Sequence, residues 1–245
     1  MIGIILAAGI GKRMRPLTRF QPKLLLPIHG EPILKLQLTT LTNYVNHIVL
    51  IIGTQGGCWN EISYRRIENL IKEFNKDDTK IEITYNDKNL TTDSSYSFKC
   101  ALNLLNPDDT LCVDGDVIFK KLLVDKLISN VYHTTLVIRP ATSKYEKGGK
   151  VIIDERKKIV ISVGRHISIK NNRPYIYSGI CKIDKENYCR LKKILENKRY
   201  YKTNLVVPLR IIAKKYKNIQ YIINEDWMNI NTLSAYIKAH KRRGF

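Results

Sequence analysis

The chain has 245 residues, of which 44% are hydrophobic, and its 42 Lys and Arg against 22 Asp and Glu give a formal net charge of +20. That hydrophobic fraction excludes a disordered chain, and no apolar run reaches the roughly 18 residues that cross a bilayer. The five cysteines are scattered without CxxC spacing, which argues against a disulfide framework or a zinc site. Because the N-terminus lacks a signal-peptide pattern, we expect a cytoplasmic protein. From the chain length we expect a single domain over residues 1–245.

The positive charge has two explanations. A basic surface can bind nucleic acid, or lysines can be spread over many exposed faces. The basic runs fall at residues 157–158, 192–193, 214–215 and 241–243, far apart in the chain. An anionic substrate also accounts for part of the local excess. We therefore favour dispersed charge and expect no nucleic-acid partner.

The first element is a continuous apolar run over residues 2–8, which predicts a strand buried on both faces. The loop Gly9-Ile10-Gly11-Lys12-Arg13 follows directly, and its glycines and cations are suited to cradling phosphate. This loop is not a dinucleotide fingerprint, because Met14 stands where the third glycine is needed. It is not a P-loop either, because Arg13 follows Gly11-Lys12 in place of Ser or Thr.

Helical and strand patterns then alternate along the chain. Helices are predicted over residues 31–44, 60–75 and 95–105, and strands over 45–53, 81–86 and 108–113. This alternation predicts a Rossmann-like α/β fold, with a mixed, mostly parallel central sheet and helices on both faces. Ligands bind such sheets at the carboxyl ends of the strands. The second half is less regular, with strands predicted over 134–139, 149–154 and 159–169 and a helix from residue 233.

The stretch LAAGIGKRMRPLTRFQPKLLLPI at residues 6–28 resembles the signature of nucleotidyltransferases that join a nucleoside triphosphate to a phosphorylated sugar or alcohol and release pyrophosphate. The resemblance implies a GT-A-like nucleotidyltransferase fold and Mg²⁺ as cofactor. It also implies a nucleotide-binding half (1–130) and an acceptor-binding half (131–245). The implied catalytic residues are Arg13, Lys23 and Asp116. The implied nucleotide-binding residues are Leu6, Ala7, Ala8, Gly9, Gly11, Lys12, Arg13, Lys23, Asp93, Ser94 and Ser95.

The resemblance assigns the metal to Asp116 and Asn231. Asp116 ends the run Val113-Asp114-Gly115-Asp116, and a carboxylate is a ligand that magnesium prefers; the same dipeptides also occur in ordinary turns. Asp114 is expected to support the site or cap the sheet. Asn231 lies in WMNINT, where the family pattern has an aspartate, so it offers an oxygen without charge. Its other explanation is a helix cap shared with Thr232.

The acceptor side is assigned to Lys150, Arg165, Tyr96 and Trp227. The family pattern of an acid, a lysine and a later lysine matches Glu146, Lys150 and Arg165, with arginine replacing the second lysine. These two cations are expected to hold the acceptor phosphate, although either is also compatible with a solvated surface position. Tyr96 and Trp227 are expected to face the cation of a choline-like acceptor, and Trp227 is otherwise explained as core.

Two stretches narrow the subfamily. Residues 85–98 resemble a segment of bacterial phosphocholine cytidylyltransferases, and WMNINT at 227–232 resembles WMDVDT of archaeal inositol-phosphate cytidylyltransferases. We therefore expect a cytidylyltransferase that joins CTP to phosphocholine or a polyol or inositol phosphate. Asp93 and Ser94 replace paired asparagines of the family, which leaves the base open. The alternatives are a hexose-1-phosphate nucleotidyltransferase using UTP, GTP or dTTP, a molybdopterin-type enzyme, or a non-catalytic nucleotide- or RNA-binding relative. A homodimer is compatible with this assignment.

Overall fold

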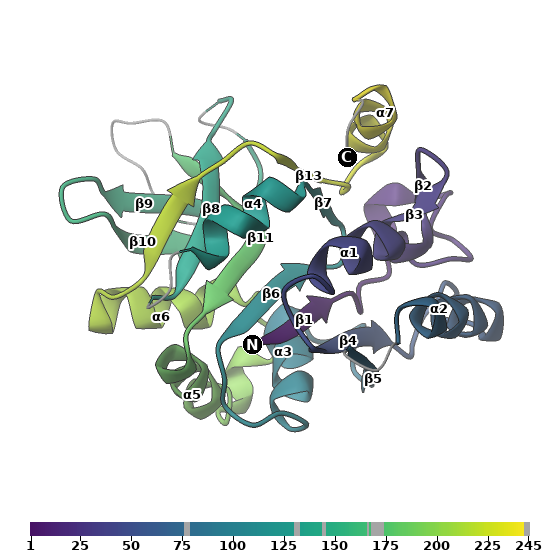
Figure 1. The fold of residues 1–245 in the computed structure, drawn as a ribbon, viewed down its shortest axis with the longest axis horizontal. Coiled ribbons are helices and arrows are strands. Elements are labelled where there is room, and N and C mark those ends of the chain that lie inside the picture. Colours follow the sequence, from purple (N-terminus) through teal and green to yellow (C-terminus); the bar gives the residue numbers. More distant parts are fainter. Residues whose placement is uncertain (76–78, 130–132, 144–145, 166, 168–173, 243–245) are drawn as a thin grey trace.

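The computed structural model describes residues 1–75, 79–129, 133–143, 146–165, 167 and 174–242. Figure 1 shows an α/β arrangement in which a central sheet lies between two groups of helices. Within the described residues the sheet has nine strands, in the order β5-β4-β1-β6-β11-β8-β12-β10-β9. The strands are β1 (Ile2–Leu6), β4 (His47–Gly53), β5 (Lys80–Asn86), β6 (Thr110–Asp114), β8 (Thr135–Pro140), β9 (Lys150–Asp154), β10 (Ile159–Gly164), β11 (Tyr175–Ile183) and β12 (Gln220–Ile223).

The sheet is mixed, and its two halves differ in strand direction. Strands β5, β4, β1 and β6 pair in parallel, as the alternation of strands and helices predicts. Strand β11 then pairs antiparallel with both β6 and β8. Beyond it β12 runs parallel to β8, while β10 is antiparallel to β12 and to β9. Strands β8 to β11 follow one another without a crossover helix in the described chain, which allows antiparallel pairing.

Helices cover both faces of this sheet (Figure 1). They are α1 (Ile33–Leu41), α2 (Glu61–Phe74), α3 (Ser94–Leu102), α4 (Lys121–Ile128), α5 (Lys185–Ile194) and α6 (Val206–Tyr216). Helix α7 (Leu233–Lys241) lies away from this sheet, and its Ala239 packs in a smaller cluster with Ile28. Because strand side chains alternate, Ile5 of β1 packs in the core beneath α1, α2 and α4, and its neighbour Ile4 packs in the core beneath α3, α5 and α6. The fold class predicted from the sequence is confirmed.

The remaining strands and helices that the structure describes are short. They are β2 (Pro27–Ile28), β3 (Glu31–Pro32), β7 (Val117–Phe119), β13 (Trp227–Asn229) and the 3₁₀ helices η1 (Lys12–Met14), η2 (Lys23–Leu25) and η3 (Lys198–Tyr200). Strand β13 pairs antiparallel with β7, directly after the Asp114–Asp116 turn. The next residue, Ile230, donates its N–H to the carbonyl of Asp116 at 2.7 Å. This pairing places Asn231 beside Asp116.

The predicted strands are found with bounds shifted by a few residues. The helix expected from residue 31 begins at Ile33, because Glu31 and Pro32 pair with β2. The strand predicted over 159–169 ends at Gly164, and residues 166, 168 and 169 lie outside the described residues. Strands β11 and β12 and helices α4, α5 and α6 were not predicted. In the described ranges no helix combines the length and apolarity that crossing a bilayer requires, and all five cysteines are free thiols.

Candidate active site

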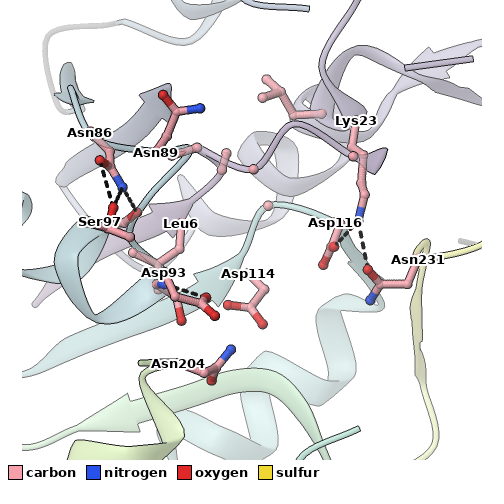
Figure 2. A pocket seen from close by; sticks show the side chains of 18 of the residues that line it. Leu6, Lys23, Asn86, Asn89, Asp93, Ser97, Asp114, Asp116, Asn204 and Asn231 are labelled. Carbon is pink, nitrogen blue, oxygen red and sulfur yellow. Dashed lines mark hydrogen bonds and ion pairs between the residues drawn. The ribbon is translucent and has the colours of Figure 1, made fainter. Parts of the chain in front are cut away.

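The parallel strands end together and open a cavity at one edge of the sheet. Leu6, the last residue of β1, pairs with Asp114 at the end of β6, and Gly53 pairs with Asn86 at the ends of β4 and β5. A cavity of about 320 Å³ lies over these ends (Figure 2). It is lined by Leu6, Ala7, Ala8, Gly9, Gly11, Lys12, Arg13, Lys23, Leu24, Asn86, Asn89, Thr92, Asp93, Ser94, Ser97, Asp114, Gly115, Asp116, Arg165, Asn204 and Asn231.

The glycine-rich loop after β1 forms one side of this cavity. Gly11 has a φ of +64° and precedes η1, and a Cβ there would lie 2.9 Å from Thr18 Cγ2. Thr18 in turn donates its hydroxyl to the carbonyl of Gly11 at 2.8 Å. Glycine is therefore required at this turn, and the turn directs Lys12 and Arg13 to the cavity. This arrangement is the one that the sequence predicts for a phosphate-binding loop.

Lys23 joins the two residues that the sequence assigns to a metal. Its Nζ donates to Asp116 Oδ2 at 2.6 Å and to Asn231 Oδ1 at 2.7 Å (Figure 2). Arg13 Nη2 donates to the same Asn231 oxygen at 2.8 Å. The side chains of Lys23 and Asp116 are only 14% and 21% exposed, so these charge-assisted hydrogen bonds are partly shielded from water. Four residues from three separate parts of the chain thus converge on one point.

The side-chain oxygens at that point are of the kind that binds magnesium. Asp116 contributes a charged oxygen and Asn231 a neutral one, and both lie within 2.7 Å of the Lys23 ammonium that stands between them. Magnesium is commonly held by one or two protein oxygens together with water and substrate phosphates. Among the described residues there is no group of three or more His, Cys, Asp or Glu side chains arranged to hold a metal. A cation bound here would therefore depend on phosphate oxygens for most of its coordination.

Asp114 lies between Asp93 and Asp116 in the view of Figure 2. Burial, followed by the negative charge of Asp116, raises the pKa of Asp114 to about 8, although Lys23 and Arg165 oppose the shift. The raised pKa means that this environment favours the uncharged form of the carboxyl more than water does. The carboxyl fits because Gly179, with a φ of +87°, has no Cβ; one built there would lie 2.5 Å from Asp114 Oδ2.

The first turn of α3 forms the opposite wall. Asp93 caps α3 by accepting from the Ser94 N–H at 2.7 Å, and its Oδ2 lies 3.9 Å from Arg165 Nη1. The Ser94 hydroxyl oxygen accepts from the Leu205 N–H at 2.9 Å. Ser95 does not line the cavity; it is buried, and its hydroxyl lies 3.2 Å from that of Thr203. Of these three predicted nucleotide-binding residues, the fold brings Asp93 and Ser94 to the site.

Two asparagines hold the neighbouring part of this wall in shape. Asn86 donates from Nδ2 to the hydroxyls of Thr92 and Ser97 at 3.1 and 3.0 Å (Figure 2). Asn89 accepts from the N–H groups of Thr54 and Gln55 at 3.2 and 2.9 Å. Both asparagines line the cavity but were not predicted as site residues, although they lie within the segment 85–98 that resembles cytidylyltransferases.

A second cavity of about 820 Å³ adjoins the first. Both cavities are lined by Arg13, Asp114, Arg165, Asn204 and Asn231. The rest of the second cavity comes from the end of β8, the loop before β9, strands β11 and β13, the start of α6 and the helix α7. A ligand in this cavity would therefore meet a ligand in the first one across the Arg13–Asn231 contact.

The four predicted acceptor residues divide into two pairs. Arg165 and Trp227 line the second cavity. Tyr96 lines neither cavity, because its hydroxyl donates to Asp87 at 3.0 Å and its ring packs 4.9 Å from that of Tyr201. Lys150 begins β9, opposite Ile176 and Gly164, and lines neither cavity.

Two further asparagines line the cavities without having been predicted there. Asn204 lines both, and its Oδ1 accepts from the Val206 N–H at 3.1 Å at the start of α6. No motif in the sequence marks this position. Asn229 stands where the family has an acid; it lines the second cavity, and its buried Oδ1 has no hydrogen-bond partner among the described residues.

The cavity is polar, lies beyond the ends of parallel strands and is lined by a glycine-rich basic loop. This combination is typical of nucleotide-binding α/β proteins. Comparison with known families narrows this class. Residues 2–243 match the nucleotidyl transferase family. Since the match covers nearly the whole chain, the chain belongs to that family, as its opening residues predict.

Curated relatives carry more than one activity name. The chain is 28% identical over 242 residues to the bifunctional protein GlmU of Methanococcus maripaludis, which covers 99% of this chain and 54% of that protein. It is 32% identical over 146 residues to the choline-phosphate cytidylyltransferase of Haemophilus influenzae, covering 59% of this chain and 51% of that one. The chain spans about half the length of these relatives.

Solved structures share the fold. The inositol-1-phosphate CTP transferase of T. maritima aligns with a TM-score of 0.75 at 20% identity, covering 100% of this chain and 97% of that one. The CTP:phosphocholine cytidylyltransferase LicC of Streptococcus pneumoniae aligns at 0.74 and 18%, covering 98% of each chain. A Bacillus anthracis protein assigned as a glucose-1-phosphate thymidylyltransferase aligns at 0.80 and 18%, covering 98% and 94%. These likenesses confirm the nucleotidyltransferase fold.

Proposed function

We propose that this chain is a magnesium-dependent cytidylyltransferase, which joins CTP to a phosphorylated alcohol such as phosphocholine or a polyol or inositol phosphate and releases pyrophosphate. The observation that carries the proposal is the contact of Lys23 with both Asp116 and Asn231 in the first cavity, because Asn231 also lines the adjoining second cavity. The first cavity is suited to a nucleoside triphosphate and the second to a phosphorylated acceptor.

The proposed reaction is one displacement at phosphorus. An oxygen of the acceptor phosphate forms a bond to the α-phosphorus of CTP, and the bond from that phosphorus to the bridging oxygen of the β-phosphate breaks. Pyrophosphate leaves with the electron pair of the broken bond. No proton has to be removed from the nucleophile, because the acceptor phosphate is already an anion. The protein therefore acts by positioning two anions and offsetting their charge.

Each residue of the cluster has a separate part in this proposal. Lys12 and Arg13 hold the β- and γ-phosphates at the turn of the glycine-rich loop, a kind of turn whose backbone N–H groups can also bind anions. Lys23 offsets the charge that develops at the α-phosphate. Asp116 and Asn231 would hold Mg²⁺, which supplies Lewis acidity toward the phosphate oxygens. Arg165 lines both cavities and is suited to the acceptor phosphate, since its planar guanidinium can bind two oxygens at once.

Two observations support CTP as the nucleotide. The Asp93 carboxylate lines the first cavity, and a carboxylate can accept a hydrogen bond from the exocyclic amino group of cytosine. Cytidylyltransferases also occur among both the curated relatives and the solved structures that this chain resembles.

A hexose-1-phosphate nucleotidyltransferase using UTP, GTP or dTTP is the second candidate. The Bacillus anthracis structure, assigned as a thymidylyltransferase for a hexose phosphate, supports it. A non-catalytic nucleotide- or RNA-binding relative is the third, since Asn229 and Asn231 replace acids and the net charge is +20. Salt-sensitive RNA binding without pyrophosphate release would favour that third candidate.

A pyrophosphate-release assay separates these candidates. Purified protein is incubated with Mg²⁺, one of the common nucleoside triphosphates and one phosphorylated alcohol or sugar 1-phosphate, over all pairs. The proposal expects release with CTP and at least one phosphorylated alcohol. Release only with UTP, GTP or dTTP and a hexose 1-phosphate would favour the second candidate, and no release with any pair would refute catalysis.

A further inference from the structure

Trp227 lies in the wall of the second cavity, where an aromatic ring could receive a cationic alcohol. The guanidinium of Arg139 already covers this ring, with its central carbon 5.2 Å from the ring centroid. The indole N–H donates to the carbonyl of Asn224 at 2.8 Å, which fixes the ring's position. Trp227 is 5% exposed, so little aromatic surface remains for a second cation.

The carboxylate that could complete a cation site is also engaged. Glu146 lines the same cavity and accepts from both terminal nitrogens of Arg139. It accepts in addition from the N–H of Thr142 at 2.7 Å and from its hydroxyl at 3.0 Å. Burial alone would raise the pKa of Glu146, but these hydrogen bonds hold it below its usual range. Oε2 accepts three of these hydrogen bonds and Oε1 accepts one, so both carboxylate oxygens of Glu146 already have donors from the protein itself.

The charge of the residues that line the second cavity also disfavours a cationic acceptor. Among the described residues its lining includes six cationic side chains, namely Arg13, Arg139, Lys147, Arg165, Lys238 and Arg242, against the acids Asp114, Glu146 and Glu225. Glu146 is neutralised by Arg139, and Glu225 is exposed to solvent. A quaternary ammonium placed here would meet like charge, which is unfavourable. The uncharged polar groups that remain, on Asn204, Asn229 and Thr232, are suited to hydroxyls.

We propose that Arg139, held over Trp227 by Glu146, makes the acceptor a phosphorylated polyol or sugar without a cationic group, and excludes acceptors of the phosphocholine type. This inference rests on the proposed function and narrows its acceptor. The guanidinium of Arg139 already occupies the face of Trp227 and the carboxylate of Glu146, which are the groups that could otherwise bind the ammonium of an acceptor. Specificity then comes as much from the unfavourable contact as from the favourable one.

The test measures acceptor binding, so that it does not depend on turnover. Protein is saturated with Mg²⁺ and a CTP analogue whose α,β-bridging oxygen is a methylene group, which cannot release pyrophosphate. It is then titrated calorimetrically with phosphocholine, glycerol 3-phosphate, inositol 1-phosphate and glucose 1-phosphate. The wild type is expected to bind at least one of the last three about tenfold or more tightly than phosphocholine. Arg139→Ala, which bares the ring and frees Glu146, should shift that ratio toward phosphocholine by about tenfold.

Arg190 offers a matched control. It lies over the ring of Tyr216 at 3.8 Å and pairs with Glu186, but it lines neither cavity. Arg190→Ala should leave the binding ratio unchanged, and circular dichroism should show both variants folded. The inference is overturned if the wild type prefers phosphocholine, if Arg139→Ala leaves the ratio unchanged, or if none of the four acceptors binds. The acceptors could bind in the predicted order while natural CTP gives no pyrophosphate. That result would refute the proposed function, but the inferred acceptor preference would still hold.

Discussion

The ammonium of Lys23 lies 2.6 Å from a carboxylate oxygen of Asp116, although the two residues are 93 positions apart in the chain. Lys23 follows the glycine-rich loop, and Asp116 follows the fourth parallel strand, β6. The sheet brings them together because β1 and β6 are neighbours and end at the same edge. In this arrangement the ammonium of Lys23 is suited to bind a polyphosphate, and the carboxylate of Asp116 is suited to bind the metal ion that accompanies it.

Replacing Lys23 with Ala should lower the turnover number by at least about a hundredfold, because the proposal places its ammonium at the charge that develops on the α-phosphate. The protein should stay folded, because Lys23 lines the first cavity and does not belong to the hydrophobic core. Lys35→Ala is the control, since Lys35 pairs with Glu31 and Glu73 and lines neither cavity. Pyrophosphate release and thermal melting give the two readouts. Equal loss of activity in both variants would contradict the role of Lys23.

Restoring a carboxylate at position 231 should strengthen metal binding. Asn231→Asp adds a negative charge beside Asp116, and a charged oxygen binds magnesium more strongly than a neutral amide. The magnesium concentration for half-maximal pyrophosphate release should fall several-fold. Asp116→Asn should shift it in the opposite direction. A magnesium dependence that is identical in both variants and the wild type would place the metal elsewhere.

Gly115 and Gly9 should respond differently to the same substitution. A Cβ at Gly115 would lie 2.5 Å from the Cβ of Ala7, whereas one at Gly9 would have nothing within 4 Å. Gly115→Ala should therefore lower the free energy of unfolding by about 1–3 kcal/mol. Gly9→Ala should leave stability nearly unchanged and weaken nucleotide binding, because Gly9 lines the first cavity. Thermal melting with and without CTP measures both effects. A stability loss at Gly9 as large as that at Gly115 would contradict this packing.

Asp184 should contribute to stability at neutral pH and lose that contribution in acid. It caps α5 and accepts hydrogen bonds from Thr134 and Asn187. Burial alone would raise the pKa of Asp184, but these hydrogen bonds outweigh burial and lower it. Stability from a depressed pKa is present above the unfolded value of about 3.9 and is lost as pH falls through the folded value.

Asp184→Asn should consequently lower the free energy of unfolding by about 1–2 kcal/mol at pH 7, with the difference from the wild type shrinking toward pH 3. Glu61→Gln, at an exposed helix pair, should cost less than about 0.5 kcal/mol at either pH. Urea denaturation across this range provides the measurement. A difference that grows as pH falls would show the opposite linkage.

The nucleotide half could be predicted because its signals are local. The apolar run of β1, the glycine loop and the alternation of strands and helices each lie within a few consecutive residues. The order of β11, β8, β12 and β10 could not be predicted, because it depends on pairings between segments far apart in the chain. Strand β12, for example, joins β8 and β10 only after two intervening helices.

The candidate site shows the same division. Lys23, Asp116 and Asn231 were predicted from motifs, and the fold brings them together. Tyr96 was expected in the acceptor site on the resemblance of its segment, but its hydroxyl is engaged by Asp87. The contact of Arg139 with Trp227 joins two strands 88 residues apart in sequence, and no local pattern indicates it.

Isotope tracing tests the central claim most directly. The acceptor is labelled with ¹⁸O in its phosphate group and incubated with CTP, Mg²⁺ and the protein. Mass spectrometry then measures the ¹⁸O content of each product. If the acceptor oxygen attacks the α-phosphorus, all the label stays in the cytidine diphosphate-linked alcohol and the released pyrophosphate carries none. Label in the pyrophosphate, or the absence of any linked product with every acceptor and nucleotide, would contradict the proposed reaction.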